Sequence, residues 1–110
     1  MHLHYTIVIY MKITKKTVIS KIENVMDPEL HISIVDLGLI QKVVVTDKKV
    51  TITMTLTSIG CPLFSVIEKQ IQTEIQTLGI PKENIHIILS FEKPWSMDDM
   101  TKNGKAMLGL

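Results

Sequence analysis

An uninterrupted alternation of apolar and polar residues runs through Val50-Thr51-Ile52-Thr53-Met54-Thr55-Leu56-Thr57. Successive side chains of a strand point to opposite faces, so one face of this segment is apolar and the other carries threonine. The pattern predicts a half-buried strand over residues 50–57, with its apolar face on a core. Asp47-Lys48-Lys49 predicts a chain reversal that joins it, as a hairpin, to a strand from Leu39 to Thr46.

Two helices and a third strand are predicted on either side of this hairpin. Apolar residues at helical spacing follow Thr14, a candidate N-cap, and the helix is predicted to end at Asp27-Pro28, because proline disfavours the α region in the residue before it. A loop follows, with a turn at Asp36-Leu37-Gly38. The second helix has Pro62 at its first position and Gly79 beyond its end, and alternation over residues 85–91 predicts the third strand.

The predicted order is helix, strand, strand, helix, strand. It indicates an α+β fold, a two-layer domain over residues 14–110 with a small three-stranded sheet and both helices on one face. In the tail after Pro94-Trp95, a short helix is predicted, with Ser96, Asp98 and Asp99 as candidate caps. Residues 1–13 are interpreted as an N-terminal arm, which is either an upstream extension before Met11 or a short edge strand.

Composition excludes several classes of protein. The 110 residues suit one domain, and no stretch approaches the roughly 18 apolar residues of a membrane span. The net charge is +1 and every basic residue is lysine, so dedicated nucleic-acid binding is not expected. A single cysteine, Cys61, excludes an intramolecular disulfide and a four-cysteine metal site. An unpaired thiol suits a reducing compartment, so we predict a cytoplasmic protein.

Cys61 is the strongest candidate for a chemically reactive residue. It lies at the predicted start of the second helix, where the positive end of the helix dipole lowers the pKa of a thiol and favours the thiolate. A thiolate binds soft metals, accepts sulfur or attacks electrophiles. Gly60 would let a ligand approach the backbone closely, and Thr57 and Ser58 offer hydroxyl groups. The alternative is a buried, inert cysteine packed beside the helix end.

Four motifs in order resemble the metal–sulfur (iron–sulfur) cluster assembly domain, which SufT and PaaD proteins and the eukaryotic cytosolic iron–sulfur targeting factors carry. The motifs are Val25-Met26-Asp27-Pro28-Glu29-Leu30, Ile34-Val35-Asp36-Leu37-Gly38-Leu39-Ile40, Thr55 to Pro62, and Pro94-Trp95. The resemblance covers about residues 17–110 and is greatest to the SufT-like members. It implies a factor that matures iron–sulfur proteins as a carrier or targeting adaptor, not an enzyme. The implied partners are assembly scaffolds or carriers and apo client proteins.

The resemblance assigns the reactive cysteine to Cys61, the acidic loop to Asp27 and Glu29, and the turn aspartate to Asp36. Ile59 departs from the pattern, because the family often has proline there. The three acidic residues could converge beside Cys61 to orient the loop, ligate iron or modulate the thiol. Alternatively, Asp27 caps a turn, Asp36 satisfies backbone N–H groups and Glu29 lies in solvent.

Several alternatives concern the remaining candidates. Trp95 is either a lid on the sheet end or an exposed anchor for a partner. His31 follows the acidic loop and could reach Cys61, whereas His86 is predicted to lie on a sheet face. His2 and His4 alternate within the arm and would share one strand face.

A cluster bound by this protein would have to be shared. One cysteine cannot hold a [2Fe–2S] cluster, which needs four ligands, so a transient cluster would require a homodimer that pairs two copies of Cys61, or a partner. The same thiol could instead serve an adaptor that never holds metal, and iron and zinc are both open. A thiol-dependent enzyme is a further alternative, opposed by the lack of a resolving cysteine. A small RNA-binding module is another, opposed by the near-neutral charge and the lack of a Gly-x-x-Gly clamp.

Overall fold

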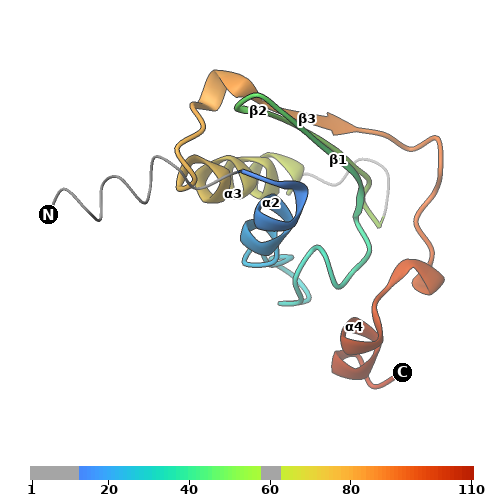
Figure 1. Ribbon diagram of the computed structural model, residues 1–110. Coiled ribbons are helices and arrows are strands. Elements are labelled where there is room, and N and C mark those ends of the chain that lie inside the picture. Colours follow the sequence, from blue (N-terminus) through green and yellow to red (C-terminus); the bar gives the residue numbers. More distant parts are fainter. Residues whose placement is uncertain (1–12, 58–62) are drawn as a thin grey trace, which may run out of the picture.

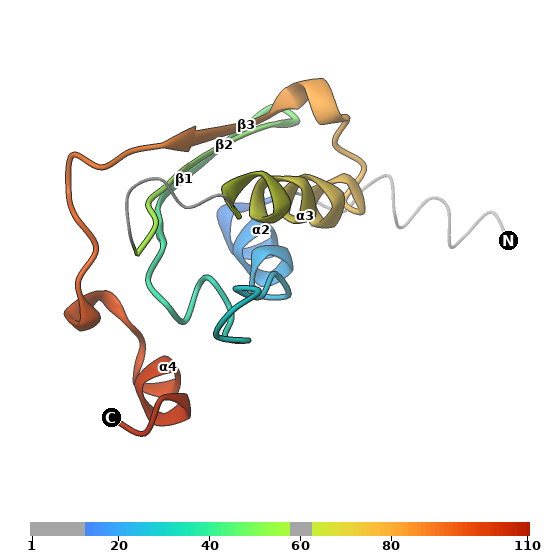
Figure 2. The ribbon, with the colours of Figure 1, turned by 180° about the vertical axis from the view of Figure 1, so that it is seen from behind.

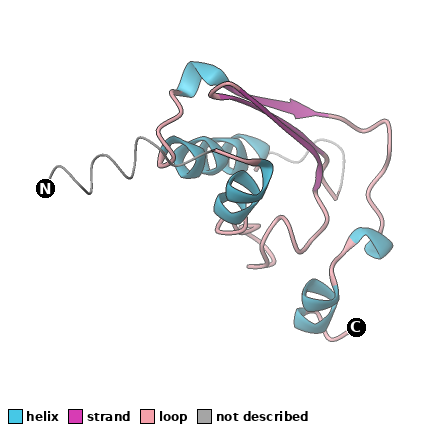
Figure 3. Cartoon of the chain, viewed as in Figure 1, coloured by secondary structure: helices cyan, strands magenta, loops and turns pink. Residues whose placement is uncertain are grey.

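The computed structural model describes residues 13–57 and 63–110, and within them the predicted α+β order is confirmed (Figures 1 and 3). The main elements are α2 (Lys15–Ile22), β1 (Ile40–Thr46), β2 (Lys49–Met54), α3 (Phe64–Gln76), β3 (Ile85–Leu89) and α4 (Lys102–Met107). Two short 3₁₀ turns, η1 (Lys82–Asn84) and η2 (Met97–Asp99), precede β3 and α4. None of the helices in these two ranges is both long and apolar enough to cross a lipid bilayer.

The described strands form one three-stranded sheet in the order β1-β2-β3. β1 and β2 pair antiparallel, with Val43 opposite Ile52, and β3 runs parallel to β2 on its other side. The hairpin turn places Asp47 and Lys48 at φ 37° and 68°, and two successive positive φ angles match the right-handed twist of the strands. The parallel pair requires a crossover, and α3 provides it.

Both α2 and α3 cover the same face of the sheet, as the two opposite views show (Figures 1 and 2). The inward side chains of β2, which are Val50, Ile52 and Met54, are fully buried, so the apolar face predicted for this strand is confirmed. The helices meet this face with fully or almost fully buried side chains: Val18 and Ile22 from α2, and Ile67, Ile71 and Ile75 from α3. Burying one such side chain contributes about 1.5–3 kcal/mol, so this layer of packing fixes the position of α3.

The first helix ends earlier than predicted. Thr14 caps it as expected, but α2 stops at Ile22, and the predicted end at Asp27-Pro28 is wrong. The backbone groups that would extend the helix are used elsewhere, because Val25 O accepts from Ile34 N at 3.0 Å. Met26 pairs with Ser33 across an isolated antiparallel bridge. These contacts close a hairpin-like loop in place of another helical turn.

Some strand and cap boundaries also differ from the prediction. β2 ends at Met54 and not at residue 57, and Thr55, predicted to lie on the polar face, is buried, which breaks the alternation. β3 ends at Leu89, two residues earlier than predicted. In the tail, Ser96 and Asp99 cap η2, whereas Thr101 caps α4. Gly79 follows α3 at φ 91°, as predicted for a residue beyond a helix end.

Candidate functional site

The loop that carries Asp27 is held closed by hydrogen bonds of its own. Asp27 Oδ1 accepts from the backbone N–H groups of Glu29 and Leu30, at 2.8 and 2.9 Å. The backbone carbonyl of Asp27 accepts from His31 N at 2.9 Å, and His31 adopts φ 57°. Asp27 therefore caps a turn, which was one of the two readings of this residue. Glu29 is exposed on the same loop.

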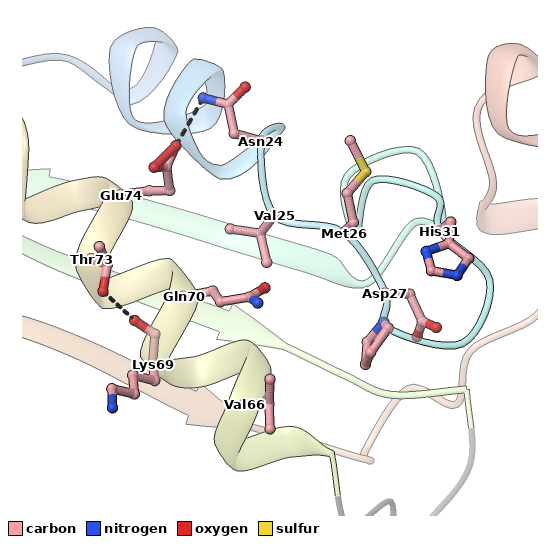
Figure 4. A pocket seen from close by; sticks show the side chains of 11 residues that line it. Asn24, Val25, Met26, Asp27, His31, Val66, Lys69, Gln70, Thr73 and Glu74 are labelled. Carbon is pink, nitrogen blue, oxygen red and sulfur yellow. Dashed lines mark hydrogen bonds between the residues drawn. The ribbon is translucent and has the colours of Figure 1, made fainter.

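A groove of about 740 Å³ runs between this loop and α3 (Figure 4). Val66, in the first turn of α3, lies on one side, and Asp27 and His31 lie on the other. A hydrogen bond of 2.9 Å from Asn24 Nδ2 to Glu74 Oε1 joins α3 to the residues that follow α2 (Figure 4). The remaining lining is mixed: Val25, Met26 and Pro28 are apolar, and Lys69, Gln70 and Thr73 are polar.

The N-terminus of α3 lacks a side-chain cap within the described residues. Its N-cap residue is Leu63, which offers no hydrogen-bonding side chain, and the first turn contains no acidic residue. The N–H groups at such an end favour an anion. Cys61 precedes Phe64, the first residue of α3, by three positions in the sequence.

The predicted thiol environment is only partly described by the structure. Ser58, Gly60 and Cys61 lie outside the described residues, so the roles predicted for them stay predictions. Pro62 also lies outside them, but α3 begins at Phe64 with Leu63 as its N-cap, so the prediction that Pro62 is the first residue of this helix is wrong. Thr57, the last described residue before them, is exposed. What the structure adds is the groove, which brings Asp27 and His31 opposite the first turn of the helix that Cys61 precedes.

Asp36 contacts a different part of the chain. Its Oδ1 accepts from Thr101 Oγ1 at 2.7 Å and its Oδ2 accepts from Asn103 Nδ2 at 3.0 Å. The Asp36 carbonyl also accepts from Thr101 N at 3.0 Å. The alternative in which the Asp36 side chain satisfies backbone N–H groups is therefore wrong, because its carboxylate accepts from side chains at the start of α4.

Trp95 docks on the same turn as α4. Its indole N–H donates to the carbonyl of Leu37, and the half-buried ring packs against the core. Close backbone contacts require two glycines: Gly38, at φ 78°, lies against Asp99, and a Cβ on Gly104 would lie 2.5 Å from the carbonyl oxygen of Asp36. The turn at residues 36–38 and the Pro94-Trp95 motif therefore pack against each other.

The three acidic residues do not converge on one site. Asp27 lines the groove against α3, whereas the Asp36 carboxylate is bound to Thr101 and Asn103. Within residues 13–57 and 63–110, no group of three or more His, Cys, Asp or Glu side chains is placed to hold a metal ion. Of the two alternatives left open for these residues, the described carboxylates do not form a common ligand group, because the Asp36 carboxylate is bound to the tail.

Thr101, Asn103 and Gly104 were missed by the sequence analysis. Thr101 caps α4 by accepting a 3.0 Å hydrogen bond from Gly104 N at its Oγ1, and threonine as a preferred N-cap residue was a readable local signal. The partner of Asn103 lies 67 positions away, at Asp36, and no local pattern could indicate it.

Residues 15–87 match the family described as "Iron-sulfur cluster assembly protein". The chain belongs to this family. It is 38% identical over 98 residues to the Fe-S protein maturation auxiliary factor YitW of Bacillus subtilis (strain 168), a match that covers 87% of this chain and 94% of that protein. It is 43% identical over 88 residues to the Fe-S protein maturation auxiliary factor SufT of Staphylococcus aureus (strain USA300), covering 78% and 98%.

A solved structure gives the same result for the fold of this iron–sulfur cluster assembly family. A domain of unknown function from Bacillus anthracis superposes with a TM-score of 0.80 at 34% identity, over 87% of this chain and 92% of that one. The resemblance stated from the four sequence motifs is therefore confirmed. The family match spans both Cys61 and the loop that carries Asp27.

We expect Asp27→Ala to loosen the acidic loop. The substitution removes the acceptor of two backbone hydrogen bonds, so it should lower the free energy of unfolding by about 1–3 kcal/mol, measured by urea denaturation. Glu29→Ala is the matched control, because Glu29 is exposed, and it should change stability by less than about 0.5 kcal/mol. Equal stabilities of the two variants would show that the turn does not depend on the Asp27 carboxylate.

Proposed function

We propose that this protein is an iron–sulfur protein maturation factor that acts through the thiolate of Cys61. The observation that carries the proposal is the family match over residues 15–87, which includes Cys61, together with relatives named as Fe-S protein maturation auxiliary factors. The start of α3, which has no side-chain cap among the described residues, gives this position a physical rationale, since the N–H groups there favour a thiolate nearby. The proposed role is that of a carrier or adaptor without catalysis of its own, in the cytoplasm.

The groove beside α3 is proposed to bind the partner protein, which is either the donor of a cluster or the client that receives it. Its mixed lining suits a peptide segment, and Asp27 contributes by fixing the shape of the loop and not by ligation. Glu29, exposed on this loop, and Thr57, exposed before Cys61, are proposed to contact the partner. Trp95 is partly buried against the core, so only the exposed part of its side chain is proposed to contact the partner.

A cluster would be the cargo of this protein and would be shared. A [2Fe–2S] cluster needs four ligands, and Cys61 supplies one. A second copy of the chain would add its own Cys61 and leave two positions to carboxylates or an external thiol, whereas a scaffold or an apo client would supply the other three. In transfer, the Cys61 thiolate replaces one cysteine ligand of the donor. The displaced thiolate takes up the proton that Cys61 released, so the exchange needs no oxidant or reductant. Thr57, Ser58 and Gly60 would shape the approach to the thiolate.

We expect Cys61→Ser to remove function and leave the fold intact. Serine is a poor ligand for soft metals, so the variant should fail to restore iron–sulfur hydratase activity in cells that lack the protein. The free energy of unfolding should change by about 1 kcal/mol or less. The double variant Cys61→Ser with Ser65→Cys moves the thiol to an exposed position in the first turn of α3 and should not restore activity. Full activity of Cys61→Ser alone would exclude cysteine chemistry as the mechanism.

The reactivity of the thiol can be measured directly. If the start of α3 favours the thiolate, iodoacetamide should alkylate Cys61 at pH 7 faster than an unstructured peptide of residues 57–66, because only the thiolate reacts. The protein in denaturant is the control, and its rate should fall to that of the peptide. A native rate at or below the peptide rate would support the buried, inert cysteine.

Carrier and adaptor differ in what accompanies the purified protein. A carrier purified without oxygen should contain acid-labile sulfide and iron, at no more than one [2Fe–2S] cluster per two chains, and Cys61→Ser should contain neither. Zinc without sulfide would contradict the carrier. An eluate free of iron, zinc and sulfide, combined with loss of function in Cys61→Ser, would support the adaptor, in which the thiol contacts a client or sulfur donor.

A further inference from the structure

We propose that residues 94–110, here named the C-terminal strap, form a lid that opens as a unit from the rest of the folded domain and is latched by Asp36. The inference concerns motion of the fold and does not depend on the proposed function. Figures 1 and 2 both show η2 and α4 beyond the end of an extended segment that leaves β3, away from α3.

The strap has few attachments to the rest of the chain. Among the described residues, a single backbone hydrogen bond joins them, from Thr101 N to the carbonyl oxygen of Asp36. The side-chain hydrogen bonds come from Trp95, Thr101 and Asn103, and all of them end on Asp36 or Leu37. Among the described residues of the strap, two large apolar side chains pack with the core: Met100, which is 5% exposed, and the half-buried Trp95. Attachment is therefore concentrated on one turn.

The strap also has little internal stability. α4 has six residues, and isolated helices shorter than about 12–15 residues are marginal in water. Most side chains of the strap are exposed, so little apolar area holds it beyond that of Met100 and the half-buried Trp95. Segments with few buried contacts open at a lower free energy than the core, and the strap fits this description.

The two Asp36 carboxylate bonds make this residue the latch. A hydrogen bond to a charged group is stronger than one between neutral groups, and the carboxylate receives one from each of Thr101 and Asn103. Gly104 completes the fit, because its lack of a side chain lets α4 approach the Asp36 carbonyl. Opening would expose this carboxylate, and it would remove one wall of the groove of about 460 Å³ that Asp36 and Met26 form together with Asn103 and Met107 of the strap.

Hydrogen exchange of the full chain, followed by mass spectrometry, tests the proposal. In the native protein, amides of residues 99–108 should exchange at least about tenfold faster than those of β2 and α3, which need global unfolding. Asp36→Asn should accelerate exchange of the strap by a further factor of about ten. The β2 and α3 amides should accelerate by no more than the same factor, because global unfolding breaks the same hydrogen bonds, so the strap should remain the faster-exchanging segment. Asp98→Asn is the control for charge in the strap, because Asp98 is exposed and no described residue bonds to its carboxylate, and it should leave exchange unchanged.

Gly104→Ala provides a second test, because helix propensity and the proposed latch predict opposite changes in the exchange rate. Alanine favours a helix over glycine, so α4 alone should exchange more slowly in this variant. The latch predicts faster exchange of the strap, because the added methyl group meets the Asp36 carbonyl. Slower exchange in Gly104→Ala, equal effects of Asp36→Asn and Asp98→Asn, or strap and core amides exchanging at one common rate would each overturn the proposal.

Discussion

The apolar face of β2 is the contact on which the other elements depend. β2 is the central strand, so Val50, Ile52 and Met54 must be covered at once by both helices, and all three are fully buried. Because α3 is fixed there by Ile67, Ile71 and Ile75, its first turn is fixed as well, and with it one wall of the groove. Loss of this packing would displace the candidate site without changing a residue in it.

The two aspartates of the family motifs have separate structural tasks. Asp27 ties a loop to itself over two and three residues, and Asp36 ties a turn to a segment that lies 65 and 67 positions further along the chain. Substitution of either is therefore expected to act through the shape of the protein, and loss of function in an aspartate variant is not by itself evidence for metal ligation. The hydrogen bonds distinguish these two roles, whereas the sequence left them open.

What the sequence predicts well in this chain is local. The alternation in β2, the cap at Thr14 and the glycine after α3 depend on neighbours within a few residues, and each is confirmed. The end of α2 was predicted wrongly because it depends on Met26 pairing with Ser33. The docking of the strap was invisible for the same reason, since its hydrogen bonds join residues that are more than 55 positions apart. The position of Cys61 was readable only through the helix predicted after it and through family motifs.

A protein that supplies only one thiolate ligand to a cluster must select its donors and clients through its surfaces. Four ligands around a small cluster define its geometry, but a single ligand from Cys61 would leave that geometry to the partner. The part of the chain that the structure describes adds no group of three ligand side chains that could compensate. On the proposed function, discrimination between donors and clients therefore depends on the groove beside α3 and on the loop of Asp27. Met26 lines this groove and also the groove beside the strap, so a change in the position of its side chain would alter both surfaces.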